Sequence, residues 1–362
     1  MRIAQVHWTA PPVVGGVEAH CESLVLQLSH RGVDVVFFTG VRQASGAPYR
    51  ELLDLRAPAP TPTAIGGFAE ELRTFDVVHW HNPQWHRPGV ARQIADRLHD
   101  TAGPKLVLDL HNLSEDAAQW AFLRDVPCSR FLVHSPFVRD QVGMHLPDRA
   151  CDLAPLAMER VVTTSALQGI PGPVILQPTR LNRWKGSHLS LAAAATLLAE
   201  GMDFTFVHAG AGDAVWPAQL DDVLDDVSKW IDADRIRLVS YRWQQSWASI
   251  GSADLVVHPT TDIGAHGEPF SLSAAQAVVC SRPLVVSDSG NLPDLLSEYE
   301  PKRVVPAGDG AALTSAMRDL LLAPAQDTPP AARELGHRLA HSLATSGVWH
   351  DSWYGRLIGA SA

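Results

Sequence analysis

The residues best suited to hold a charged ligand are Arg180 and Lys185, two cations in one loop. The loop spans residues 179–186, follows a short apolar run at 174–177 and leads into a helical pattern. Two cations beside the N-terminus of a helix can clamp a diphosphate, because both donate to phosphate oxygens and the helix adds free N–H groups. The alternative interpretation is a solvated basic turn without a ligand.

A second loop, at residues 260–272, carries the carboxylate of Glu268 just before another helical pattern. Loops of this length between regular elements are usually functional, and a carboxylate there can accept hydrogen bonds from sugar hydroxyls. Gln276 follows on nearly the same side of the expected helix. The alternative for Glu268 is an acid placed at a helix start, where the helix dipole favours it.

Two further positions lie at the ends of strand-like runs. Gly15 and Gly16 follow the first run and open a helical pattern, so that an anion can approach the backbone and the free N–H groups of the helix. They lack the third glycine of the dinucleotide-binding pattern, which leaves a simple packing turn as the alternative. His111 directly follows the run at 105–110, and its alternative is a core or capping histidine.

Three histidines, His79, His81 and His86, form a local group, and strand alternation puts the first two on one face. A zinc site needs further ligands, and no carboxylate or cysteine at ligand spacing joins the three in the sequence. We therefore expect no metal site.

The elements that must position these residues alternate between strand and helix along the chain. Short apolar runs predict strands at 2–8, 33–38, 76–80, 105–110, 130–134, 174–177, 204–208, 235–240, 254–258, 283–287 and 303–305. Helical patterns lie at 15–31, 86–99, 115–124, 136–146, 186–200, 216–230, 270–280 and 309–323. Such alternation predicts an α/β protein with parallel sheets covered on both faces.

Two such series in 362 residues predict two doubly wound, Rossmann-like domains, at 1–165 and 172–335. The stretch at 168–173 is rich in glycine and proline and is interpreted as the linker. The tail at about 340–362 is amphipathic and aromatic, and we expect it to pack on the first domain. Ligands of such sheets lie beyond the carboxyl ends of the strands, so we expect the domains to face each other across a ligand-binding cleft.

Composition narrows the class of partner and the compartment. The net charge of −10 argues against binding of nucleic acid or of anionic membranes. The N-terminus lacks the apolar run of a signal peptide, and the most apolar helical run is too short to span a bilayer. The four cysteines are dispersed without a CxxC pair. These features predict a cytoplasmic protein without a stable membrane anchor.

Together these residues resemble the retaining glycosyltransferases of family 4, which have the GT-B fold. The resemblance covers nearly the whole chain and is most specific in its third and fourth motifs. The motifs are PPVVGGVE at 11–18, DVVHWH at 76–81, GEPFSLSAAQA at 267–277 and RPLVVSDSGNLPD at 282–294. The family usually has a second glutamate where this chain has Gln276. That departure removes the charge-assisted part of a hydrogen bond to the nucleotide ribose, although the amide carbonyl can still accept.

The resemblance implies roles for particular residues. It places His111, Arg180, Lys185 and Glu268 in catalysis, with His111 beside the donor sugar and the two cations on the diphosphate. The donor-binding set that it implies is Gly15, Gly16, Arg180, Lys185, Gly267, Glu268, Pro269, Phe270, Ser271, Leu272 and Gln276. The candidates for contact with the acceptor are Glu18, His20, His81, Asn82, Glu115 and His134.

The implied reaction is transfer of a sugar from a nucleotide-diphosphate sugar, with retention of configuration and without a metal or a resident cofactor. A UDP-sugar is the favoured donor and a GDP-sugar the alternative. The acidic charge favours a small, polar, soluble acceptor, such as an aminocyclitol or another secondary metabolite, and the composition resembles that of a GC-rich bacterial genome. Two other functions stay open: a sugar-nucleotide epimerase or hydrolase with the same fold, and an inactive protein that binds nucleotide sugars.

Overall fold

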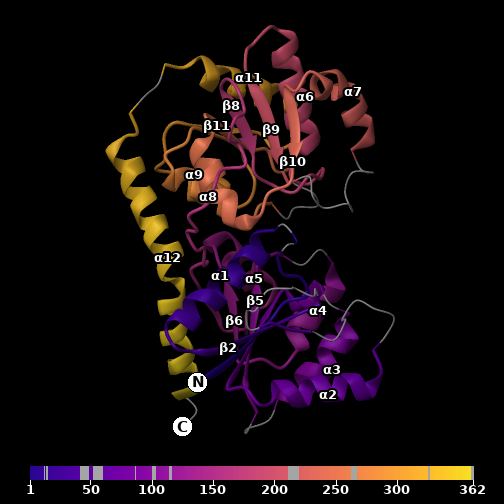
Figure 1. The fold of residues 1–362 in the computed structure, drawn as a ribbon. Coiled ribbons are helices and arrows are strands. Elements are labelled where there is room, and N and C mark those ends of the chain that lie inside the picture. Colours follow the sequence, from indigo (N-terminus) through magenta and orange to yellow (C-terminus); the bar gives the residue numbers. More distant parts are fainter. Residues whose placement is uncertain are drawn as a thin grey trace. The chain divides into compact units, whose positions relative to one another are not determined.

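The computed structural model describes residues 1–11, 13, 15–40, 49–51, 60–85, 87–99, 103–113, 116–210, 220–261, 267–324 and 327–359. The chain forms two compact units (Figure 1). Unit 1 contains residues 1–13, 17–159 and 342–362, and unit 2 contains residues 14–16 and 160–341. Each unit is built around a parallel sheet.

Unit 1 is a doubly wound sheet whose described strands have the order β3-β2-β1-β4-β5-β6-β7. The strands are β1 (Arg2–Val6), β2 (Asp34–Thr39), β3 (Tyr49–Glu51), β4 (Val77–His81), β5 (Lys105–Leu110), β6 (Arg130–Val133) and β7 (Cys151–Leu153). The helices between them are α1 (Gly16–His30), α2 (Pro62–Leu72), α3 (Pro88–Leu98), α4 (Ala117–Asp125) and α5 (Pro136–His145).

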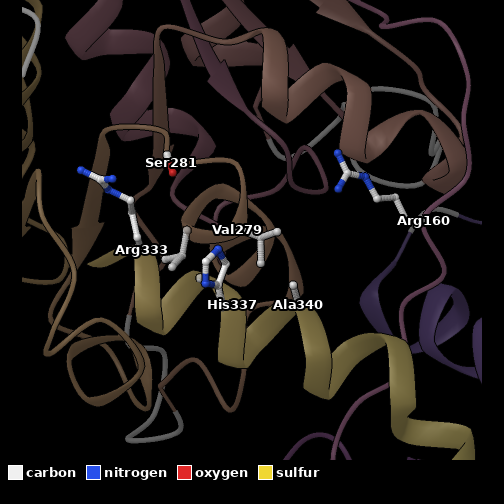
Figure 2. Close-up of a pocket in the computed structure, with 8 residues that line it drawn as sticks. Arg160, Val279, Ser281, Arg333, His337 and Ala340 are labelled. Atoms are coloured by element: carbon white, nitrogen blue, oxygen red, sulfur yellow. The ribbon is translucent and has the colours of Figure 1, made fainter. Parts of the chain in front are cut away.

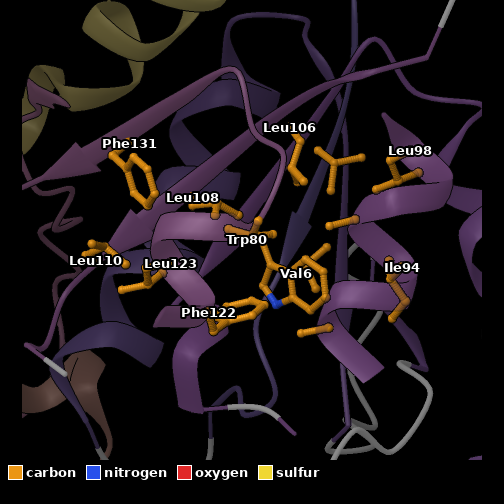
Figure 3. Close-up of a cluster of buried hydrophobic side chains, with 14 of the residues drawn as sticks. Val6, Trp80, Ile94, Leu98, Leu106, Leu108, Leu110, Phe122, Leu123 and Phe131 are labelled. Carbon is orange, nitrogen blue, oxygen red and sulfur yellow. The ribbon is translucent and has the colours of Figure 1, made fainter. Parts of the chain in front are cut away.

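Both faces of this sheet are buried, because successive side chains of a strand point to opposite faces. In β4, Val78 and Trp80 belong to one apolar cluster, whereas Val77 belongs to the cluster on the other face. Figure 3 shows the first cluster, in which Trp80 and Leu108 lie among side chains of α3 and α4. The second cluster packs against α1 and against the helix near the C-terminus.

Unit 2 repeats the plan, with the strand order β10-β9-β8-β11-β12-β13. The strands are β8 (Val174–Gln177), β9 (Thr205–Ala209), β10 (Ile236–Val239), β11 (Leu255–His258), β12 (Leu284–Ser287) and β13 (Lys302–Val305). The helices are α6 (Ser187–Ala199), α7 (Asp221–Asp232), α8 (Ser246–Ser252), α9 (Leu272–Val279), α10 (Leu292–Leu295) and α11 (Gly310–Leu322). In each sheet the sequence order of strands reverses beside the first strand, and such switch points place loops for ligand binding.

The last helix, α12 (Pro330–Gly359), is 30 residues long. Its first part belongs to unit 2, and its residues from Ser342 onward belong to unit 1. In unit 1, Tyr354 is fully buried and Gln27 donates to the carbonyl oxygen of Leu343 over 2.9 Å. Among the described residues, no helix has both the length and the apolar character needed to cross a bilayer.

The predicted strands are confirmed, with ends that differ from the observed ones by at most a few residues. The prediction missed the short strands β3 and β7 as well as the helices α2, α8 and α10. The start of α2 did carry a signal, because Thr61 caps it by accepting the N–H of Ala64 and Pro62 follows. Of the helix predicted at 216–230, the first four residues lie outside the described residues.

Candidate functional site

The loop after β8 holds Lys185 in a fixed backbone conformation. Asn182 accepts the N–H of Lys185 over 2.7 Å, and Gln177 donates to its carbonyl oxygen over 2.8 Å. The neighbouring carbonyl of Trp184 accepts from the backbone N–H of Thr261 over 2.8 Å. These bonds tie the loop to the end of β11, so that the ammonium group can be aimed with little loss of entropy on binding.

Lys185 and Glu268 form a buried ion pair in unit 2. The Nζ atom of Lys185 lies 2.5 Å from Oε2 of Glu268, and the two side chains are only 15% and 5% exposed. The hydroxyl of Thr260 donates to the same carboxylate oxygen over 3.0 Å. The ammonium also lies 3.9 Å from the ring centroid of Trp184. The structure therefore brings together two of the predicted catalytic residues, one from each predicted loop.

Two glycines permit the close backbone contacts around this pair. Gly186 has φ of +69°, and a Cβ atom there would lie 1.9 Å from the carbonyl oxygen of Pro259. Gly290 has φ of +53°, and a Cβ atom there would lie 2.3 Å from the carbonyl oxygen of Glu268. Any other side chain would displace one of the two loops.

The motif after Glu268 turns directly into α9. Ser271 caps this helix by accepting the N–H of Ala274, and Nε2 of His258 lies 2.7 Å from the hydroxyl of Ser273. Burial lowers the pKa of His258 to about 4, so its imidazole is neutral at pH 7. Of the other predicted donor-binding residues in the motif, Gly267, Pro269 and Leu272 are buried and Phe270 is half-buried.

Gln276 is fully buried on α9, and its side-chain amide donates to the hydroxyl of Ser246 over 2.8 Å. One N–H of the amide thus has a partner within unit 2, and its oxygen is a hydrogen-bond acceptor. Its role in nucleotide binding stays a prediction.

The remaining predicted donor-binding residues are Arg180, Gly15 and Gly16. Arg180 is half-buried in the same loop as Lys185. Gly16 is the exposed first residue of α1, and Gly15 before it is half-buried. Gly16 is thus at a helix N-terminus, as predicted, and the phosphate-binding roles of the three residues stay predictions.

In unit 1 the loop after β5 is held by Asn82, which has φ of +47°. Its side-chain oxygen accepts the backbone N–H of His111 over 2.9 Å and that of Asn112 over 3.2 Å. Asparagine tolerates this left-handed conformation better than most residues. Asn82 is buried and fixes the loop that carries His111.

His111 points into a polar cluster that replaces part of the apolar core of unit 1. Strand register places His79 beside Gln5, and His81 beside Asp109. We call the following six residues the polar core: Gln5, His79, His81, Asp109, His111 and His134. They come from β1, β4 and β5 and from the ends of β5 and β6.

A carboxylate joins the histidines of β4 in the fold, although none lies at ligand spacing in the sequence. Asp109 Oδ2 lies 3.0 Å from Nε2 of His79 and 3.3 Å from Nδ1 of His81. Sequence spacing missed this carboxylate because it comes from the neighbouring strand, where parallel register brings it level with His81. His86, the third histidine of that group, lies outside the described residues.

Most of the predicted acceptor-binding residues are buried in unit 1. Glu18 accepts a hydrogen bond of 2.6 Å from the hydroxyl of Thr9, and His20 accepts the backbone N–H of Ala157 over 2.8 Å. His81 and His134 belong to the polar core. Glu115 lies outside the described residues. Acceptor contact therefore stays a prediction for this set.

Sequence reasoning did not single out Thr260, Asp109 or Tyr354. Tyr354 of α12 lies with its hydroxyl 2.6 Å from Nδ1 of His79, and it accepts a hydrogen bond of 3.1 Å from Gln5. A usable signal existed, because polar residues recur at the carboxyl ends of neighbouring strands that are otherwise apolar.

A pocket of about 340 Å³ in unit 2 lies elsewhere, between the end of α9 and the first turns of α12 (Figure 2). Arg160, Ser281, Arg333 and His337 contribute its polar lining. None of its lining residues belongs to the predicted donor site. We therefore do not place the donor there.

The fold and these loops define a protein of the GT-B class, with two doubly wound units and charged residues on the loops after the strands. Residues 14–153 match the family model described as Glycosyltransferase Family 4, and residues 172–323 match the model described as Glycosyl transferases group 1. The chain belongs to these glycosyltransferases. A comparison with curated proteins found no match.

Solved structures of the GT-B class are similar over nearly the full chain. Sucrose-phosphate synthase from Thermosynechococcus elongatus has a TM-score of 0.73 at 19% identity, and 99% of each chain is covered. HepE from Anabaena, in complex with UDP and glucose, has a TM-score of 0.73 at 16% identity, with 98% of this chain and 99% of that chain covered. AviGT4, a glycosyltransferase of avilamycin A biosynthesis, has a TM-score of 0.61 at 17% identity, with 99% of this chain and 98% of that chain covered.

Proposed function

We propose that the protein transfers a sugar from a nucleotide-diphosphate sugar to a small soluble acceptor, with retention of the anomeric configuration. The observation that carries this proposal is the buried Lys185–Glu268 pair on the loops after β8 and β11. A sugar diphosphate offers an anion to the ammonium and hydroxyls to the carboxylate. Each partner can therefore exchange a contact within the protein for a contact with the donor.

The chemistry assigned to the site is a same-face substitution. The bond between the anomeric carbon and the diphosphate oxygen breaks, the acceptor oxygen bonds to that carbon from the same side, and the acceptor proton goes to the departing diphosphate. Arg180, Lys185 and the N-terminus of α1 at Gly16 stabilise the charge that develops on the diphosphate. No metal is needed at the diphosphate in this scheme, because the cations are side chains.

His111 is assigned to the donor sugar. Its Nε2 atom lies 2.9 Å from Nδ1 of His81, and its Nδ1 atom has no hydrogen bond among the described residues. Burial lowers the pKa of His111 to about 3, so the imidazole is neutral and acts by hydrogen bonding rather than by charge.

A UDP-sugar is the proposed donor and a GDP-sugar the alternative. The titles of the HepE structures name UDP and UDP-glucose as ligands of that protein, which supports uridine. The acceptor-binding candidates Glu18, His20, His81, Asn82, Glu115 and His134 are proposed for unit 1.

A small polar acceptor, such as an aminocyclitol or another bacterial secondary metabolite, is supported by the net charge of −10 and by α1, which carries no lysine or arginine. The similarity to AviGT4, which is named for an antibiotic pathway, points the same way. The four free cysteines support a reducing, cytoplasmic compartment.

The test is incubation with a panel of labelled UDP- and GDP-sugars, with and without aminocyclitol and aminosugar acceptors. We expect product only when donor and acceptor are both present, and NMR should show the same anomeric configuration in donor and product. Release of free sugar or an isomerised donor without acceptor would instead identify a hydrolase or an epimerase. Donor binding by calorimetry with no turnover would identify an inactive binding protein.

A further inference from the structure

The polar core contains three atoms that could also bind one metal ion. Three atoms, Nδ1 of His81, Nε2 of His111 and Oδ2 of Asp109, face one another at the ends of β4 and β5. The two nitrogens lie 2.9 Å apart, and each lies 3.3 Å from the carboxylate oxygen. All three side chains are at most 5% exposed.

This triangle is close to the dimensions of one coordination shell. Zinc binds imidazole nitrogen and carboxylate oxygen at about 2.1 Å, which puts neighbouring ligand atoms roughly 3.0–3.4 Å apart. The two separations of 3.3 Å fall in this range, and the 2.9 Å between the nitrogens is slightly shorter, so small rotations of the side chains would let one ion contact all three atoms. Two imidazoles and one carboxylate also form a donor set that zinc uses in proteins.

The outer contacts orient the three groups as ligands. Nε2 of His81 lies 2.6 Å from the side-chain oxygen of Gln5, so His81 donates there and keeps a lone pair on Nδ1. His134 contacts the other carboxylate oxygen of Asp109, with its Nε2 atom 2.7 Å from Oδ1. Partners of this kind fix the tautomer and orientation of metal ligands.

The surroundings also favour a cation. The carboxyl group of Asp109 is fully buried with imidazoles as its neighbours, and a buried carboxylate needs compensation.

An independent observation comes from His20 on α1. One ring nitrogen of His20 and one ligand atom from each of the three proposed ligands all lie within 4.8 Å of one another. Its Nδ1 atom accepts from Ala157, so Nε2 carries the proton of the neutral ring. This buried Nε2 atom has no hydrogen-bond partner among the described residues. It is suited to donate to a hydroxide or other small anion in the fourth position of an ion.

We propose that His81, Asp109 and His111 form a zinc site in the interior of unit 1, with the N–H of His20 directed at the fourth ligand. The ion links β4 to the loop after β5 and so holds the loop that carries His111. The site shares His111 and His81 with the proposed transfer reaction, but metal content can be measured without that reaction. The Lys185–Glu268 pair lies in unit 2.

The experiment measures metal in untagged protein. The wild type is unfolded with chelator, refolded with Zn²⁺ or Co²⁺ and dialysed, and its metal is measured by plasma mass spectrometry. We expect about one equivalent per chain, with the visible absorption of tetrahedral Co²⁺ in the cobalt form. We also expect the thermal midpoint of the zinc form to lie above that of the metal-free form.

Two variants and one control locate the ion. His81→Gln and Asp109→Asn should each weaken metal affinity by more than about 100-fold, since loss of an outer partner alone costs 10- to 100-fold. His208→Gln is the control, because His208 is equally buried but lies in unit 2, with its Nε2 atom 2.9 Å from the hydroxyl of Ser187. It should retain the metal.

Two results would overturn the proposal. One is refolded wild-type protein that holds less than about 0.1 equivalent of either metal, which would leave a hydrogen-bonded network only. The other is unchanged metal content in both variants. If the variants fail to fold, the wild-type stoichiometry and the cobalt spectrum still decide the question.

Discussion

Substitutions in the Lys185–Glu268 pair can distinguish an effect on stability from an effect on activity. In Lys185→Met the carboxylate of Glu268 loses a cation at 2.5 Å and, among the described residues, keeps the hydroxyl of Thr260. Removal of one partner of a buried pair costs about 3–5 kcal/mol, and we expect the lower end because Lys185 is partly exposed. Loss of a donor to the leaving group lowers kcat about 100- to 1000-fold.

The double variant Lys185→Met with Glu268→Gln distinguishes the two effects. A neutral amide does not need the cation, so the thermal midpoint should return most of the way to that of the wild type while kcat stays low. Lys229→Met is the matched control, since the ammonium of Lys229 also stacks on a tryptophan, 5.0 Å from the ring centroid of Trp230. Nucleotide release measures kcat, and calorimetry measures the midpoint. A kcat within about threefold of the wild type in Lys185→Met would refute the assignment.

Four further outcomes can be measured. Gln276→Glu should change the donor KM more than kcat, and an unchanged KM would place this side chain outside the nucleotide site. Gly290→Ala should lower both stability and activity, because its Cβ would lie 2.3 Å from the carbonyl oxygen of Glu268; normal values for both would contradict the contact. EDTA added to the folded enzyme should leave transfer within about twofold, since Arg180 and Lys185 stabilise the diphosphate, whereas abolition with rescue by Mg²⁺ would show a catalytic metal. Burial lowers the pKa of His208 to about 3, below its unfolded value near 6.5, so its contribution to stability is complete above pH 6.5 and falls toward pH 3. His208→Gln should accordingly flatten the decline of the thermal midpoint between pH 7 and pH 5, and an unchanged slope would count against a neutral, buried His208.

Much of the fold was predictable because most of the strands are apolar runs with buried side chains on both faces. The run 105–110 is predicted with the observed ends of β5, and 174–177 with those of β8. The three-residue strands β3 and β7 were not predicted, because they lie at the edges of the sheet and are too short to show a periodic pattern in the sequence.

The candidate donor site in unit 2 was predictable in outline for a similar reason. The strand-to-helix loops of a doubly wound sheet gather at one edge, so residues 179–186 and 260–272 were expected to lie near each other. The direct pairing of Lys185 with Glu268 was not predicted, because it depends on bonds such as the one from Asn182 that fix the loop backbone. Sequence spacing does not encode such contacts between loops.

The polar core shows where spacing arguments fail in a parallel sheet. His79 and His81 lie two positions apart and so share a face, but their carboxylate partner, Asp109, lies 28 positions after His81 in the sequence. Only the register of β4 with β5 makes them neighbours. In a sheet of this kind, ligands for an ion are therefore better sought across the ends of adjacent strands than within one motif. Applied to unit 1, this approach selects His81 at the end of β4 together with Asp109 near the end of β5 and His111 directly after it.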